Sequence, residues 1–212
     1  HVVDLMQYVV GPISEVSGLL STVHSQRPIL PMGQATHFAV IEDGELGDVE
    51  NDDYAAAIVR FAADSPGAGA VGTLEASRVI VGPQCGLGFE VYGTEGSATW
   101  NFEQMNELKL AIGRKGPSQG YTTILGNSSQ GDYAAFQPGP GNSMGYDDLK
   151  VIEAKKFLIA VTGGEQRNST IQEALADAEV ISAVAASAVD GQWHKVSQVP
   201  GATFGHKQAS NA

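Results

Sequence analysis

The residues best suited to proton chemistry lie at the start of the chain. His1 and Asp4 are three residues apart, in the run His1-Val2-Val3-Asp4. On a helix this spacing places an imidazole and a carboxylate on one face. Because histidine changes charge near neutral pH, the pair predicts a site that takes a proton from a bound molecule or returns one. The alternative interpretation is an exposed helical pair, or the remainder of a tag that ends in histidine.

A glycine motif and the remaining histidines carry weaker signals. Gly67, Gly69 and Gly72 fit the spacing G-x-G-x-x-G. A dinucleotide phosphate needs a helix after the third glycine, whereas residues 73–81 alternate like a strand, so we interpret the motif as a hairpin turn. The histidines lack the spacing of metal ligands, and we expect no metal site. They are His1, His24, His37, His194 and His206.

Composition restricts the partners and the compartment. The chain has 12 Lys and Arg residues against 24 Asp and Glu residues, a net charge of -12 that repels nucleic acid and anionic membranes. No apolar run approaches the ~20 residues of a membrane-spanning helix. The single cysteine, Cys85, cannot form an intramolecular disulfide. Its simplest interpretation is a buried thiol in a protein of the reducing cytoplasm.

Periodicity predicts the elements that must position these residues. Alternating apolar and polar residues predict strands, joined by short turns, at residues 54–61, 73–81, 89–91, 97–102 and 108–112. Residues 26–53, which are acidic and rich in Pro and Gly, predict a long surface loop. Apolar residues at helical spacing predict helices at the N-terminus, from residue 147 to Gly163, and over residues 171–190.

The order of these elements predicts the fold class. Strands followed by helices indicate an α+β fold, with a mainly antiparallel open sheet and helices packed on one of its faces. We expect the last helix to present the apolar stripe that includes Ile171, Leu175 and Ile181. The length suits one domain over residues 1–200, followed by a flexible tail over residues 201–212.

Several stretches, in sequence order, resemble the C-terminal substrate domain of the Gfo/Idh/MocA oxidoreductases, the family of glucose-fructose oxidoreductase and inositol dehydrogenase. The stretches are His1 to Ile13, Gly72 to Arg78, Phe89 to Ser97, Asn106 to Leu108, Gly145 to Asp148 and Glu173 to Trp193. The resemblance implies a glyceraldehyde-3-phosphate-dehydrogenase-like C-terminal domain. It also implies that the N-terminal Rossmann domain, which is the main site for NAD or NADP, is absent from this chain.

The resemblance further implies an activity and a set of site residues. The activity is that of an NAD(P)-dependent dehydrogenase of a secondary alcohol in a sugar or polyol, with this chain inactive alone. His1 corresponds to the catalytic histidine that takes the hydroxyl proton, and Asp4 to a residue that contacts the substrate hydroxyls or orients that histidine. Cys85, in a pocket-lining loop of residues 82–88, and Tyr146 correspond to further substrate contacts. The open sheet face is the expected contact of a homodimer or homotetramer.

One alternative comes from a different functional class. A stand-alone, non-catalytic binding or oligomerisation module would use the same fold without a nucleotide-binding half. A Rossmann sequence upstream of His1 would distinguish the dehydrogenase from this module.

Overall fold

The computed structural model of the chain describes residues 1–30, 33, 41, 43–113, 120–137, 139 and 141–205. Its helices are α1 (Val2–Val10), α2 (Tyr146–Val161) and α3 (Ile171–Asp190), with short 3-10 helices η1 (Phe102–Gln104) and η2 (Gly131–Ala135). Its strands are β1 (Ile13–Ser21), β2 (Gln26–Pro28), β3 (Leu46–Asp48), β4 (Tyr54–Phe61), β5 (Val71–Ser77), β6 (Gly88–Tyr92), β7 (Gly96–Asn101), β8 (Glu107–Ile112), β9 (Thr122–Leu125) and β10 (His194–Lys195). The predicted α+β class and antiparallel pairing are confirmed.

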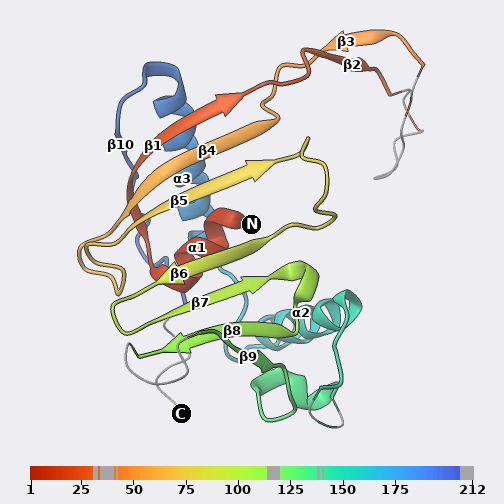
Figure 1. Cartoon of the computed structure of the whole chain (residues 1–212), viewed down its shortest axis with the longest axis vertical. Helices are drawn as coiled ribbons and strands as arrows, with labels where there is room; N and C mark the ends of the chain where they lie inside the picture. Colours follow the sequence, from red (N-terminus) through yellow and green to blue (C-terminus); the bar gives the residue numbers. More distant parts are fainter. Residues whose placement is uncertain are drawn as a thin grey trace.

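Eight of the ten described strands form two four-stranded antiparallel sheets instead of one continuous hydrogen-bonded sheet. The first has the order β10-β1-β4-β5 and the second β6-β7-β8-β9 (Figure 1). The break falls between β5 and β6, where the connecting segment contains Gly82 with a φ of 123° and Pro83. Glycine adopts this positive φ without strain, and proline, which has no N–H to donate, suits a connection outside the strands.

The core lies between the first sheet and helices α1 and α3. Val16 and Val59 are paired across β1 and β4 and are both fully buried, as is Val180 of α3. Gly18 permits a close approach, because a Cβ there would lie 2.8 Å from a methyl group of Val184. Both helices therefore cover the same face of the first sheet, while the opposite face is open (Figure 1).

Helix α3 buries a different face from the predicted one. Ile171, Leu175 and Ile181 are exposed. The residues that α3 buries are Glu173, Ala176, Val180, Ala183, Val184 and Ser187. The reason is geometric. The Ser187 hydroxyl accepts a hydrogen bond from the N–H of Gly18 (2.9 Å) and donates one to the carbonyl of Gln192 (2.6 Å). Val184 lies directly over Gly18, so this face of α3 is held close to β1.

Helix α2 is held mainly at its beginning. The side chain of Asn106 makes two hydrogen bonds of 2.9 Å with the main chain of Met144, and the Asp148 carboxylate accepts from the N–H of Gly145. None of the described α2 residues is buried, so the apolar face that the sequence places on this helix is open here.

The described part of the predicted surface loop over residues 26–53 extends from the body (Figure 1). It contains the hairpin β2-β3, which the composition of the segment did not predict. The base of the hairpin is fixed by Asp53, whose side chain is fully buried and pairs with Arg27 (2.6 Å) and Arg78 (2.8 Å).

At the far end of the chain, Phe204 is buried against the body. Residues 206–212 of the predicted tail lie outside the described residues, so the boundary at residue 200 stays a prediction. No helix in the described part of the chain has the length and hydropathy needed to cross a membrane.

Candidate functional site

Helix α1 carries the two residues that the sequence singles out for proton chemistry. His1 is its N-cap residue and is exposed, and Asp4 lies in its first turn and is partly buried. The helix ends at Gly11, whose φ of 129° suits glycine, and packs on α3, β5 and β6. The imidazole and the carboxylate thus sit at one end of a helix that is fixed to the core through Val3.

Two carboxylates of α3 join Asp4 in an acidic cluster, which we define as Asp4, Glu173 and Asp177. Burial is the main cause that raises the pKa of Asp4, and the nearby Glu173 carboxylate adds to it. Burial also raises the pKa of Asp177, which accepts a hydrogen bond of 2.8 Å from Gln7, and Asp4 adds to that rise. Perturbed carboxylates are enriched at functional sites.

The sequence reasoning missed the two α3 members of this cluster. Glu173 and Asp177 are four residues apart, a spacing that puts them on one helical face. That spacing was the available signal, but the approach of α3 to α1 is tertiary. Glu173 also caps its own helix, since it accepts from the N–H of Thr170 (2.6 Å).

The acidic cluster predicts how stability depends on pH. A carboxyl group whose pKa is raised by folding stabilises the fold fully below its unfolded pKa of ~3.9, and this contribution is lost as the pH rises through its folded pKa. Asp4→Asn removes the charge, so it should raise Tm at pH 7 by about 1–2 °C, a small effect because Asp4 is partly exposed. Near pH 3 the two proteins should unfold alike.

Thermal unfolding at both pH values checks this expectation, with Asp64→Asn as the control. Asp64 is an exposed aspartate of the turn after β4. An Asp4→Asn protein that is less stable than the wild type at pH 7 would contradict the view that the Asp4 charge destabilises the fold.

Cys85 lies in the segment between β5 and β6, and it is exposed, so the interpretation of a buried thiol is wrong. The physical reason is the carboxylate of Glu103, which accepts from the N–H groups of Gln84 (2.6 Å) and Cys85 (2.8 Å) and holds this segment on the surface. Those same hydrogen bonds lower the pKa of Glu103.

Tyr146 begins α2 and is exposed. Its ring meets Phe102 edge-on at a centroid distance of 6.3 Å, and the Lys150 ammonium lies 5.3 Å from the ring. Within the part of the chain that the structure describes, no hydrogen bond or ion pair joins any two of His1, Asp4, Cys85 and Tyr146. The structure places His1 and Asp4 at the start of α1. Cys85 and Tyr146 lie on separate elements.

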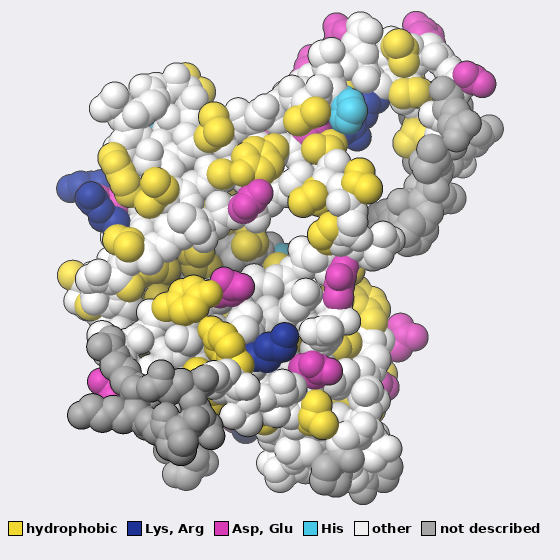
Figure 2. All heavy atoms as spheres, viewed as in Figure 1, with side chains coloured by type: hydrophobic (Ala, Val, Ile, Leu, Met, Phe, Trp, Pro, Cys, Tyr) yellow, Lys and Arg dark blue, Asp and Glu magenta, His cyan; other side chains and the backbone are white. Residues whose placement is uncertain are grey.

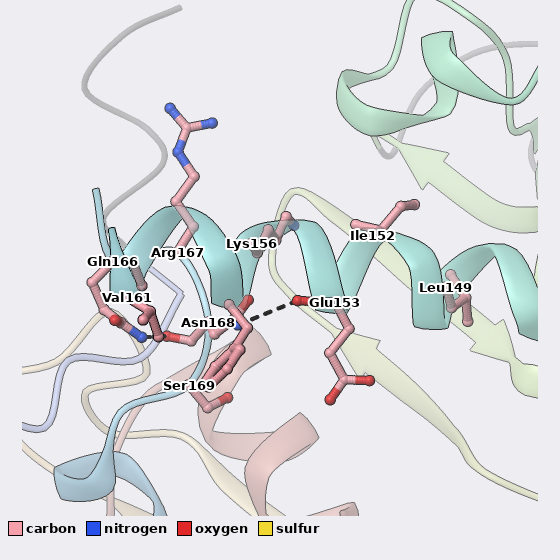
Figure 3. A pocket seen from close by; sticks show the side chains of 11 residues that line it. Leu149, Ile152, Glu153, Lys156, Val161, Gln166, Arg167, Asn168 and Ser169 are labelled. Atoms are coloured by element: carbon pink, nitrogen blue, oxygen red, sulfur yellow. Dashed lines mark hydrogen bonds between the residues drawn. The ribbon is translucent and has the colours of Figure 1, made fainter. Parts of the chain in front are cut away.

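A large hollow on the described surface lies elsewhere. It has a volume of about 740 Å³ and is formed by α2 and residues 166–169. Figure 3 shows Asn168 directed toward the main chain of α2, where its amide donates to the carbonyl of Glu153 (3.5 Å). This open hollow contains neither a histidine nor a cysteine, so we place the candidate site at α1.

The glycine motif does not form a cofactor loop. Gly67 and Gly69 lie in the turn between β4 and β5, which pair as a hairpin, and Gly72 lies inside β5. A Cβ at Gly67 would lie 2.8 Å from Val10, so glycine serves close packing there. The hairpin interpretation is confirmed, and the described residues provide no helix N-terminus after the third glycine to receive a pyrophosphate.

The described histidines His1, His24 and His194 belong to no cluster of metal ligands. Among the described residues, no group of three or more His, Cys, Asp or Glu side chains is arranged to hold a metal ion. His37 and His206 lie outside the described residues.

Comparison with known proteins defines the class of this fold. Residues 1–99 match the GFO/IDH/MocA C-terminal domain. Levoglucosan dehydrogenase from Pseudarthrobacter phenanthrenivorans is 32% identical over 202 residues, which cover 94% of this chain and 50% of that protein. The chain thus spans about half the length of this curated relative.

Solved structures agree with this match. The apo form of levoglucosan dehydrogenase superposes with a TM-score of 0.83 at 31% identity, covering 94% of this chain and 50% of that one. An NAD binding oxidoreductase from Klebsiella pneumoniae gives 0.79 at 31% identity, with 93% and 49% covered. The chain belongs to the Gfo/Idh/MocA oxidoreductase family and corresponds to its C-terminal domain.

Proposed function

We propose that this chain is the substrate-binding half of an NAD(P)-dependent oxidoreductase that acts on a secondary alcohol of a sugar or polyol. The observation that carries the proposal is the placement of His1 and Asp4 on α1 beside two further carboxylates. The similarity to a levoglucosan dehydrogenase, solved in complex with NADH and L-sorbose, supports the sugar class. The nicotinamide cofactor binds mainly to a part of the whole protein outside this chain.

The proposed chemistry assigns one role to each residue. The neutral imidazole of His1 takes the proton from the substrate hydroxyl and later releases it to water. Asp4 accepts a hydrogen bond from a substrate hydroxyl or from the imidazole, while Cys85 and Tyr146 contact the substrate. The bound cofactor supplies the acceptor for the hydride that leaves the same carbon.

Turnover by the whole gene product tests this function. The purified protein is mixed with NAD⁺ or NADP⁺ and, in turn, with anhydrosugars, aldoses and polyols, while the absorbance of the reduced cofactor is followed. We expect steady turnover with at least one sugar or polyol and with one of the two cofactors. A protein that binds a sugar yet never reduces either cofactor would contradict the proposal and favour the non-catalytic binding module.

We also propose that the open face of the first sheet is the contact in a homodimer or homotetramer. Leu19, Ile58 and Val71 lie on this face and are 58%, 51% and 72% exposed. Figure 2 shows apolar side chains on this face. Light scattering of the whole protein should give a mass of two or four copies, and a single-copy mass would refute the contact.

The compartment is a proposal as well. A chain with one cysteine, exposed and free, suits the reducing cytoplasm, where thiols stay reduced.

A further inference from the structure

Gln7 is an unusual residue for the middle of a short helix packed on a core. It is 1% exposed, and among the described residues of α1 it shares burial only with Val3. Both polar atoms of its amide form hydrogen bonds. Nε2 donates to Oδ1 of Asp177 on α3 at 2.8 Å, and Oε1 accepts from the N–H of Ile13 at the start of β1 at 3.0 Å. One side chain thus ties α1 to two other elements.

These bonds fix α1 in a way that apolar contacts do not. Buried apolar side chains allow a helix to rotate or slide by small amounts at little cost, whereas hydrogen bonds have defined lengths and directions. The bond to Asp177 is assisted by the charge of the carboxylate. A leucine of similar volume would satisfy the core but leave the Ile13 N–H and the Asp177 carboxylate without this partner.

The fixed helix is the one that carries His1 and Asp4. Residues 1, 4 and 7 follow one another at three-residue spacing, so Gln7 lies about 9 Å along the helix axis from His1. A small rotation about a loosened Gln7 would displace the imidazole at the helix end. Displacements near 1 Å cost about 100-fold in rate when a catalytic group must meet a reacting atom.

We propose that Gln7 is a positioning residue: its two buried hydrogen bonds set the placement of His1 and Asp4 for proton transfer. This inference rests on the proposed function. Gln7 does not touch the substrate, and it acts through the orientation of α1.

Gln7→Leu in the whole protein is the first test. We expect kcat to fall by about 10-fold to 100-fold while KM for the cofactor changes less than about 3-fold. In the cofactor-free protein, amide hydrogen exchange should become faster along α1. The matched control is Val180→Ala, which opens a cavity at a fully buried position of α3 and should lower Tm while leaving kcat near the wild-type value.

The second test exchanges the amide and the carboxylate between positions 7 and 177. It remains informative if Gln7→Leu does not fold. Gln7→Glu brings two carboxylates together and should lower kcat and speed exchange in α1. Adding Asp177→Asn supplies an amide that donates to the new carboxylate, which still accepts from Ile13, so the double variant should recover the slow exchange in α1. Failure of the recovery, or a Val180→Ala protein of equal Tm that loses as much kcat, would overturn the positioning role.

If the proposed function is wrong, the turnover of the His1 and Gln7 variants differs from the results expected above. If removing the His1 imidazole leaves turnover unchanged, the chemistry assigned to α1 is wrong whatever Gln7 does. If that removal abolishes turnover and Gln7→Leu does not slow it, only the inference about Gln7 fails.

Discussion

Replacing His1 by alanine in the whole protein should lower kcat by about 100-fold or more, with KM for the sugar changed only a few-fold. The expected loss is within the usual contribution of a general base. His1 is exposed at the N-cap of α1 and makes no side-chain capping hydrogen bond, so its removal should leave the fold intact. Steady-state kinetics with the sugar and cofactor identified by the turnover screen provide the measurement.

A matched control makes the result specific. His24→Ala removes another exposed histidine, at the base of the β2-β3 hairpin, and should leave kcat unchanged. Near-normal kcat in His1→Ala would remove His1 from the mechanism.

The largest loss of stability from a single substitution should occur at Asp53. Hydrogen bonds from the His24 N–H and the Arg78 side chain are the main causes that lower the pKa of Asp53 to about 2, with the Val23 N–H and the Arg27 charge adding to them. Asp53→Asn keeps the size but removes the charge that two arginines face. We expect Tm at pH 7 to fall on the order of 10 °C, as for other broken buried ion pairs.

The pH dependence of this loss in Tm shows whether the charge of Asp53 is its cause. A carboxylate with a lowered folded pKa stabilises the fold fully above its unfolded pKa of ~3.9, and this contribution is lost as the pH falls toward about 2. The difference in Tm between wild type and Asp53→Asn should therefore be greatest above pH 4 and narrow toward pH 2. Asp52→Asn, at the exposed neighbouring position, should not change Tm. A constant difference across this range would contradict the ionic explanation.

Local patterns in the sequence predicted the elements closely. Alternation placed a strand at residues 54–61, where β4 is found, because one face of the strand is buried and the other is not. The last helix was predicted over its full range, since its apolar residues follow helical spacing and Gly191 comes directly after its last turn. These features depend on interactions between residues that are near in sequence.

The features that depend on distant partners were not predicted. The buried face of α3 is determined by the close approach to Gly18 of β1, which Val184 and Ser187 contact, while Leu175 stays exposed. Hydrophobicity alone favours the opposite face. Similarly, the acidic run before β4 gave no sign that Asp53 is a buried ion-pair centre, because its partners Arg27 and Arg78 are about 25 residues away on either side.

The candidate site was predicted in part. The sequence singles out His1 and Asp4 because they are one helical turn apart, whereas Asp177 and Gln7 meet across 170 positions of sequence. A contact of that separation is created by the packing of α1 on α3, and nothing in the local sequence of either helix specifies it.

The central claim is that His1 takes the proton from a hydroxyl of a bound sugar. The most direct measurement is a crystal structure of the whole protein with its nicotinamide cofactor and a sugar or polyol that it oxidises. The account predicts an imidazole nitrogen of His1 within about 2.6–3.2 Å of the hydroxyl on the carbon that faces the nicotinamide ring. A complex in which another side chain contacts that hydroxyl, with the His1 imidazole directed away from the sugar, would contradict it.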